Sequence, residues 1–180
     1  MIMNWKTIST ETELDTKYVT VYKDKVQVND IEVIDDFYTV KIQDAALIVA
    51  LTPDGNVILK SEYRYACRAE VIECPAGMVE ANEDPMDTAK RELLEETGYA
   101  GDKWTYLGPT LESTSKLTNT MHIFLAENCV KVDGQHLDKN EHLEFCLVDL
   151  KDAVNMVMSG KINANSSAHA ILKVARIAEV

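Results

Sequence analysis

The sequence predicts an α/β fold, with a mixed sheet between helices and an antiparallel sheet near the beginning of the chain. Three observations lead to this prediction. Residues 17–42 alternate in polarity as strands do, residues 45–60 have the pattern of a buried strand with a hairpin partner, and one central helix is followed by two more near the end. At 180 residues the chain is long enough for one domain with a substantial core.

Residues 1–42 form a predicted N-terminal β-sheet region. Residues 1–16 are polar and carry little pattern beyond Trp5, whereas the rest of the region predicts two or three strands with Lys23–Lys25 as a turn. An isolated hairpin buries little apolar surface by itself. We therefore expect this region to pack on the main domain, residues 43–180, or on another subunit.

Strands continue through the main domain. Ala45–Leu51 is a continuous apolar run, as expected for a strand buried on both faces, and Thr52–Gly55 is a turn into a partner strand at Asn56–Lys60. A polar loop, residues 134–140, precedes the last strand. Further strands are predicted at 70–74, 103–108, 121–126 and 143–148, and helices at 150–159 and 165–178.

One central helix is predicted over Pro85–Thr97. Asp84 is a suitable N-cap, proline suits the first helical position, and Gly98 can end the helix in a left-handed conformation. Residues recur at helical spacing on two faces. They are a buried stripe of Met86, Ala89, Leu93 and Thr97, and a second face of Glu92, Glu95 and Glu96.

The three glutamates on the second face are expected to attract a cation. Like charges within one turn repel each other, and the negative end of the helix dipole adds to that repulsion. Hard oxygen ligands at this density suit Mg²⁺ or Mn²⁺. The alternative is a solvated acidic face in which Arg91 pairs with Glu95.

The segment Gly77–Tyr99 follows an ordered motif. After Gly77 come five residues, Glu83, seven residues, Arg91-Glu92-Leu93, one residue, Glu95-Glu96, one residue and Gly98-Tyr99. This pattern resembles the complete Nudix box, including its two apolar positions. The resemblance implies the Nudix α/β/α sandwich. It also implies a loop–helix–loop that binds divalent metal and hydrolyses nucleoside diphosphates linked to another moiety.

The resemblance assigns metal ligands to this motif. It implies Glu92 and Glu96 as the central ligands and Glu95 as a further ligand. The backbone carbonyl of Ala76 joins them, and Glu83 reaches in from the loop as an auxiliary ligand. All five positions offer oxygen atoms, which suit the predicted Mg²⁺ or Mn²⁺.

Two further residues of the motif take other roles by the same resemblance. Arg91 orients the glutamates by salt bridging and is counted with them as catalytic, and Gly77 is a predicted substrate-binding position. The formal net charge of −12 makes a cation necessary, because the chain itself repels a diphosphate. Bound Mg²⁺ neutralises the carboxylates, attracts phosphate oxygens and acidifies a water molecule.

Residues outside the motif resemble positions of the ADP-sugar hydrolases in this superfamily. Arg64 stands where an arginine of that group contacts substrate, with a surface ion pair as its alternative, and Arg68 is a weaker candidate. Glu73 stands where that group has a glutamate; as an alternative it is a structural partner of Arg91. Glu141, in the loop before the last strand, matches a proposed general base, against the alternative of a solvated loop position.

Two other segments bear on this resemblance. ADP-sugar hydrolases carry an N-terminal sheet that is exchanged across a homodimer, and residues 1–42 resemble it, so a homodimer is expected. Ser113–Ser115 stands where that group has Ser-Pro-Gly and a later Ser-x-Glu. This departure leaves the fold intact and leaves the identity of the sugar or leaving group open.

Composition argues against several classes of protein. The pI is about 4.7 and the sequence has no basic patch, which argues against binding of nucleic acid polymers. We expect a cytoplasmic protein without a membrane partner, because no apolar run reaches the length of a membrane span and residues 1–10 lack a signal peptide's apolar core. Four cysteines without paired spacing predict neither a zinc site nor a disulfide framework.

The predicted function is Mg²⁺-dependent hydrolysis of the pyrophosphate bond of a nucleoside diphosphate sugar, with ADP-ribose giving AMP and ribose 5-phosphate. Alternative substrates are NADH, another nucleotide sugar or a nucleoside triphosphate. From a different class, the alternative is a non-catalytic nucleotide sensor. The intact motif favours an enzyme, because a protein that only binds has no need for this many clustered carboxylates.

Overall fold

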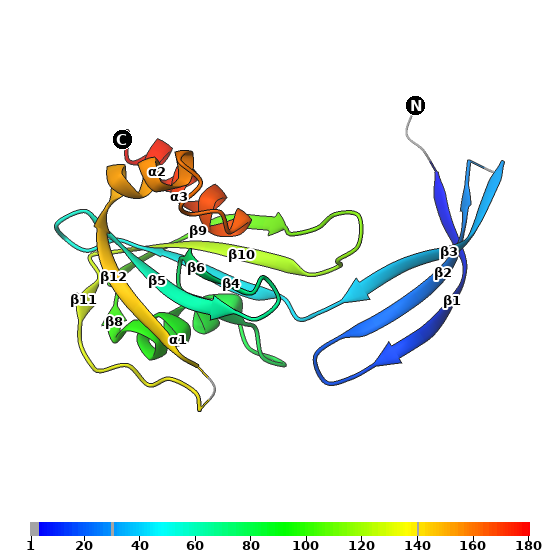
Figure 1. Cartoon of the computed structure of the whole chain (residues 1–180), viewed down its shortest axis with the longest axis horizontal. Coiled ribbons are helices and arrows are strands. Elements are labelled where there is room, and N and C mark those ends of the chain that lie inside the picture. Colours follow the sequence, from blue (N-terminus) through cyan, green and yellow to red (C-terminus); the bar gives the residue numbers. More distant parts are fainter. Residues whose placement is uncertain (1–3, 30, 140) are drawn as a thin grey trace. The chain divides into compact units, whose positions relative to one another are not determined.

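The computed structural model describes residues 4–29, 31–139 and 141–180. Residues 1–3, Asp30 and Asn140, which fall in the predicted N-terminal region and the predicted polar loop, lie outside the described residues. The chain divides into two compact units, Met1–Asp44 with Leu111–Thr120, and Ala45–Thr110 with Met121–Val180 (Figure 1). Within the described part of the chain, no helix is both long and apolar enough to cross a membrane.

The first unit contains a three-stranded antiparallel sheet in the order β1-β2-β3. Its strands are β1 (Trp5–Asp15), β2 (Thr20–Val28) and β3 (Glu32–Lys41). The rings of Trp5 in β1 and Phe37 in β3 pack in a T-shaped arrangement, with ring centroids 5.6 Å apart. Backbone pairing to β2 and this aromatic contact between the two outer strands therefore hold the sheet together.

One prediction for this sheet is wrong, because Lys23–Lys25 lie inside β2 instead of in a turn. The polar residues after Trp5, for which the sequence predicted no particular strand, form β1. Every residue of β1 is exposed, so the strand lacks the alternation of apolar and polar residues on which its recognition depends. Lys23 pairs with Glu11 of β1 and Tyr38 of β3, so its charge lies on a paired strand and not in a loop.

The segment Leu111–Thr120 belongs to the first unit although it lies far along the chain. The backbone N–H of Val40 donates to Lys116 at 2.8 Å, and the N–H of Thr118 donates to Val40 at 3.1 Å. The ammonium of Lys116 also lies 5.0 Å from the centre of the Phe37 ring. The unusual Ser113–Ser115 sequence is therefore part of a segment that is bonded to β3.

The second unit holds the remaining elements, apart from the ends of β9 and β10 that fall in Leu111–Thr120. Its strands and helices are β4 (Ala45–Ala50), β5 (Asn56–Arg64), β6 (Ala69–Glu73), β7 (Ala76–Met78), α1 (Pro85–Thr97), β8 (Tyr99–Ala100), β9 (Lys103–Leu111), β10 (Thr120–Glu127), β11 (Val130–Lys131), β12 (Leu143–Asp149), α2 (Leu150–Met158) and α3 (Asn165–Ile177). The sheets have the orders β7-β4-β10-β9, β12-β5-β6 and β11-β8. Because β4 is parallel to β10 and antiparallel to β7, the predicted mixed sheet is confirmed.

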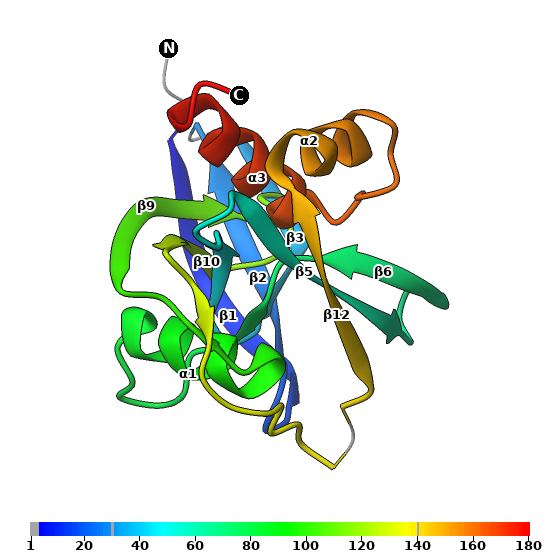
Figure 2. The same cartoon turned by 90° about the vertical axis from the view of Figure 1, so that its left-hand side faces the viewer.

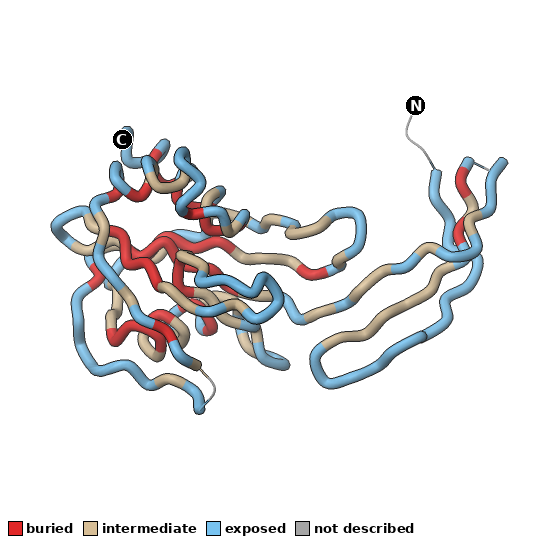
Figure 3. Tube along the Cα trace, in the orientation of Figure 1, coloured by how far each residue is buried: buried red, intermediate tan, exposed pale blue. Residues whose placement is uncertain are grey.

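Helices cover both faces of these strands, as Figure 2 shows, with α1 on one side and α2 and α3 on the other. Alternate residues of β4 serve the two faces: Leu47 and Val49 join the cluster with α2 and α3, and Ala46, Ile48 and Ala50 join the cluster with α1. Buried positions therefore run continuously along β4 (Figure 3). The predicted α/β/α sandwich, with β4 buried on both faces, is confirmed.

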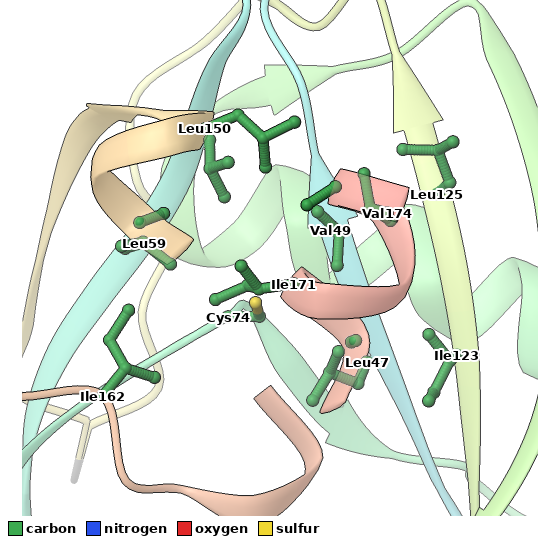
Figure 4. Close-up of a cluster of buried hydrophobic side chains, with 14 residues drawn as sticks. Leu47, Val49, Leu59, Cys74, Ile123, Leu125, Leu150, Ile162, Ile171 and Val174 are labelled. Atoms are coloured by element: carbon green, nitrogen blue, oxygen red, sulfur yellow. The ribbon is translucent and has the colours of Figure 1, made fainter. Parts of the chain in front are cut away.

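Figure 4 shows the cluster under α3, where Ile171 and Val174 lie against Leu47 and Val49 of β4. Cys74 is buried in the same cluster, and burial raises the pKa of its thiol to about 12. It therefore behaves as a small apolar side chain. All four cysteines are free.

The central helix α1 has the predicted bounds and caps. Asp84 accepts a hydrogen bond from the backbone N–H of Met86 at 2.8 Å, and Pro85 takes the first helical position. Gly98 ends the helix with a φ of 74°, a left-handed conformation that glycine adopts at little cost. These caps fix where the helix ends and therefore where its glutamates lie.

Candidate active site

The acidic end of α1 lies against the backbone of β7. Gly77 approaches the Glu92 carboxylate so closely that a Cβ atom at position 77 would lie 2.0 Å from Glu92 Cδ. Pairing of Ala76 and Gly77 with Leu47 and Ala46 of β4 holds this backbone in place. The glycine of the motif is therefore required for the close approach of a carboxylate to the main chain.

Arg91 binds three carboxylates at once. Its Nε and Nη2 donate to the two oxygens of Glu83 at 3.0 and 3.1 Å. Its Nη1 donates to Glu92 Oε1 at 2.7 Å and to Glu95 Oε2 at 3.0 Å. One guanidinium thus compensates the repulsion between the glutamates of α1 and joins them to the preceding loop.

These contacts shift the protonation of the carboxylates. Hydrogen bonds from Arg91 lower the pKa of Glu83 to about 2, and the Glu83 carboxylate raises the pKa of Arg91. For Glu92, burial raises the pKa, although the charge and hydrogen bond of Arg91 oppose it. Glu83 is therefore firmly ionised, whereas Glu92 is protonated more easily.

Glu96 is the innermost carboxylate of α1 and is 2% exposed. Its Oε1 accepts a hydrogen bond from the ammonium of Lys60, and its Oε2 accepts one from the backbone N–H of Ala76 at 3.2 Å. Burial raises the pKa of Glu96 to about 7, with the charge of Lys60 acting against that rise. Its ionisation therefore changes close to neutral pH.

Lys60 is a residue of this site that the sequence did not reveal. It lies in β5 and is 2% exposed, although lysine is among the residues least often buried. It lies two positions after Ile58, whose side chain belongs to the cluster under α1, and so points to the same face of the strand. A lysine that alternates in register with buried strand positions is a sequence signal for a buried charge. Its meaning depends on Glu96, which lies 36 positions away.

The paired strands β5 and β6 bring the side chains of Arg64 and Glu73 together. The Nε atom of Arg64 donates to Glu73 Oε1 at 2.8 Å, and its Nη2 contacts the same oxygen. Its Nη1 lies 3.1 Å from Glu62 Oε2. Desolvation lowers the pKa of Arg64, but the Glu73 and Glu62 carboxylates outweigh it and raise the pKa. The alternative pairing of Glu73 with Arg91 is wrong, because Arg91 is bound to other carboxylates.

Glu141 lies beside a cavity of about 550 Å³. The cavity is lined by Ser61, Glu62, Tyr63, Glu70, Leu137, Glu141, His142, Leu143 and Glu144. Glu141 Oε2 accepts a hydrogen bond from the backbone N–H of Asp138 at 3.0 Å, which orients the carboxylate. Its charge contributes to the raised pKa of Glu92, so the cavity side and the α1 carboxylates are electrostatically linked.

The glutamates predicted to bind metal are paired with Arg91 and Lys60 of the protein itself. Among the described residues, no three or more His, Cys, Asp or Glu side chains are arranged to hold a metal ion together. The donor chemistry nevertheless fits a hard divalent cation, because Arg91 Nη1 contacts one oxygen of Glu92 and one of Glu95. Two carboxylates of α1 can thus contact a single cationic centre.

Known proteins resemble this chain in sequence and in fold. The NUDIX domain family matches residues 41–169. The ADP-ribose pyrophosphatase of Bacillus subtilis (strain 168) is 32% identical over 167 residues, which cover 92% of this chain and 90% of that protein. The methanol dehydrogenase activator of Bacillus methanolicus is 28% identical over 171 residues, with 92% and 90% covered.

A solved structure has a similar fold. It is described as an ADP compounds hydrolase and matches with a TM-score of 0.83, over 97% of this chain and 94% of that chain. The sequences are 19% identical, so the likeness is one of fold.

Proposed function

The chain belongs to the NUDIX domain family, and on that premise we propose that it hydrolyses the diphosphate of ADP-ribose to AMP and ribose 5-phosphate. The observation that carries this proposal is the set of α1 carboxylates gathered around Arg91 and closed against the backbone at Gly77. The name of the Bacillus subtilis relative supports ADP-ribose as the substrate.

The cation would be Mg²⁺, with Mn²⁺ as a substitute. It would be held by oxygens of Glu92, Glu95 and Glu96, by the carbonyl of Ala76, and by Glu83 as an auxiliary ligand. When bound, such an ion supplies positive charge for phosphate oxygens and acidifies a water molecule. A cation is needed here because Glu62, Glu70, Glu141 and Glu144 line the cavity, and the charge of Glu141 acts on Glu92.

The protein's own side chains would orient the reactants. Arg91 holds Glu92 and Glu95 in one arrangement through a single nitrogen, so that their oxygens are positioned before substrate binds. Glu141, fixed by the N–H of Asp138, would accept a proton from the attacking water. Arg64, with its side chain 40% exposed, would bind a phosphate or ribose oxygen while Glu73 and Glu62 hold its position.

The cavity of about 550 Å³ would take part of the nucleotide sugar. Its size lies within the range of about 300–1,000 Å³ that is common for small-molecule sites. Tyr63 contributes an aromatic ring to its lining, on which a base or ribose can pack.

We also propose that the protein is a homodimer formed through the first unit. The three-stranded sheet leaves Trp5, Ile8, Leu14 and Val33 between 45% and 49% exposed, and a small sheet of this kind needs a partner surface. Analytical ultracentrifugation would give the mass of a dimer, and Ile8→Glu would shift the protein toward monomer. A monomeric wild-type protein would exclude this assembly. The cytoplasmic location stays a prediction from the sequence.

The test of the proposed function is a substrate panel. The protein is incubated with Mg²⁺ and ADP-ribose, other nucleotide sugars, NADH or a nucleoside triphosphate, and the products are separated by chromatography beside Glu96→Gln. Release of AMP from ADP-ribose that is lost in the variant is the expected result. Preferential turnover of another compound would reassign the substrate. Nucleotide binding without any turnover would indicate a sensor.

A further inference from the structure

Lys60 is the charged partner of Glu96 in the interior, and both residues are 2% exposed. An ammonium in a dry interior is unfavourable unless carboxylates compensate its charge. Lys60 Nζ contacts Glu96 and lies 3.6 Å from Glu62 Oε2. Lys60 is therefore held inside the carboxylate group and is not part of the outer surface.

Two cations of the protein divide the carboxylates between them. Arg91 contacts Glu83, Glu92 and Glu95, and Lys60 contacts Glu96. They differ in their freedom to move. The Arg91 side chain is 31% exposed and has solvent to move into, whereas the Lys60 side chain is 2% exposed and is enclosed by the strand and helix that carry the site.

The oxygens of Glu96 are both engaged. Oε1 accepts from Lys60 and Oε2 accepts from the N–H of Ala76. A divalent ion that binds Glu96 must share Oε1 with an ammonium or displace the Ala76 hydrogen bond. Repulsion between an ammonium and a divalent ion at such short range is strong in a poorly solvated site.

We propose that Lys60 is a positioning residue that limits the divalent cations bound at the α1 carboxylates. This inference rests on the proposed metal centre. The Lys60 ammonium supplies the positive charge at Glu96 that an additional ion would otherwise supply. The first ion would be held mainly by Glu92 and Glu95 and would share Glu96 with Lys60. A lysine that served only as a counter-ion for folding would leave metal binding unchanged when replaced.

The experiment is a titration of the metal-free protein with Mn²⁺, followed by electron paramagnetic resonance and by calorimetry. Lys60→Met keeps the length of the side chain and removes its charge. We expect this variant to bind more Mn²⁺ per chain than the wild type, or to bind it at least about five-fold more tightly, the lower end of common coupling between sites. Lys60→Arg keeps the charge and is expected to retain the wild-type stoichiometry.

Two controls separate the local effect from general ones. Lys103→Met removes an equal charge from an exposed pair with Glu127, whose atoms lie 2.6 Å apart. It should leave Mn²⁺ binding unchanged. Lys60→Met combined with Glu96→Gln should lose the gain, because the released carboxylate is gone. Circular dichroism establishes that each variant is folded. If Lys60→Met does not fold, Lys60→Gln serves as the uncharged variant.

The outcomes separate this inference from the proposed function. Unchanged or weaker Mn²⁺ binding in the uncharged variants would overturn the role of Lys60 while leaving the metal centre in place. An equal gain in Mn²⁺ binding by Lys103→Met would also overturn the role of Lys60, because the change in net charge alone would then explain the gain. If neither the wild type nor any variant binds Mn²⁺, the proposed metal centre fails and this inference fails with it.

Discussion

The guanidinium of Arg91 binds both oxygens of Glu83, at 3.0 and 3.1 Å, across eight positions of the chain. This pair joins the loop before α1 to the helix itself. Through Nη1 the same guanidinium reaches Glu92 and Glu95, so the loop and the carboxylates of α1 are positioned together. A change on either side of the pair is therefore transmitted to the candidate site.

Replacing Arg91 with lysine is expected to lower both turnover and stability. Lysine keeps the charge but lacks the planar fork that holds Glu83 with two bonds while reaching other carboxylates. We expect the free energy of unfolding to fall by about 1–2 kcal/mol, since these charge-assisted bonds are partly exposed. Urea unfolding measures the change, with Lys90→Ala as the control on the exposed neighbour. Unchanged stability and turnover would contradict a common role for Arg91.

The stability of the protein is expected to fall in acid partly through Glu83. Its pKa lies at about 2 instead of the ordinary 4.5, so its stabilising contribution is complete above pH 4.5 and is lost as the pH falls toward 2. Urea unfolding at a series of pH values would show that the wild type loses more stability over this window than Glu83→Gln. Parallel curves for the two proteins would show that the ion pair contributes nothing.

Gly77→Ala is expected to impair the site without unfolding the protein. The new Cβ would lie 2.0 Å from Glu92 Cδ, and the flexible end of Glu92 can move away. A shift of about 1 Å in a catalytic group can reduce turnover by about 100-fold. Gly134→Ala is the matched control, because nothing lies within 4 Å of a Cβ built there. Equal turnover in the two variants would refute the role of this close approach.

Mn²⁺ binding is expected to strengthen as the pH rises from 6 to 8. Burial raises the pKa of Glu96 to about 7, so its carboxyl group is largely protonated below that pH and ionised above it. The ionised form attracts a metal ion to the neighbouring carboxylates and the neutral form does not, so binding releases a proton at the lower pH. Calorimetry in buffers of different ionisation enthalpy counts that proton. The pH dependence should be weaker in Glu96→Gln, and an equal slope in both proteins would rule out Glu96 as its source.

Local signals in the sequence were sufficient for the central helix and for the longer strands of the main domain, whereas the short strands β7, β8 and β11 were not predicted. Asp84, Pro85 and Gly98 act within one turn of the helix ends, so the bounds of α1 follow from neighbouring residues alone. The apolar run at Ala45–Ala50 likewise reports a strand buried on both faces. The strand β1 was not recognised, because both of its faces are exposed and its residues carry no alternation of burial.

The sequence by itself therefore determined the family motif, the carboxylates of α1 and the layered α/β fold, since each depends on spacing along a short stretch of chain. Only the tertiary structure decided which charges from different strands and helices meet. Lys60 and Glu96 are 36 positions apart and come into contact because β5 lies under α1. Arg64 meets Glu73 because β5 and β6 are paired. Contacts of this kind depend on how elements pack in space, for which a linear pattern carries no local signal.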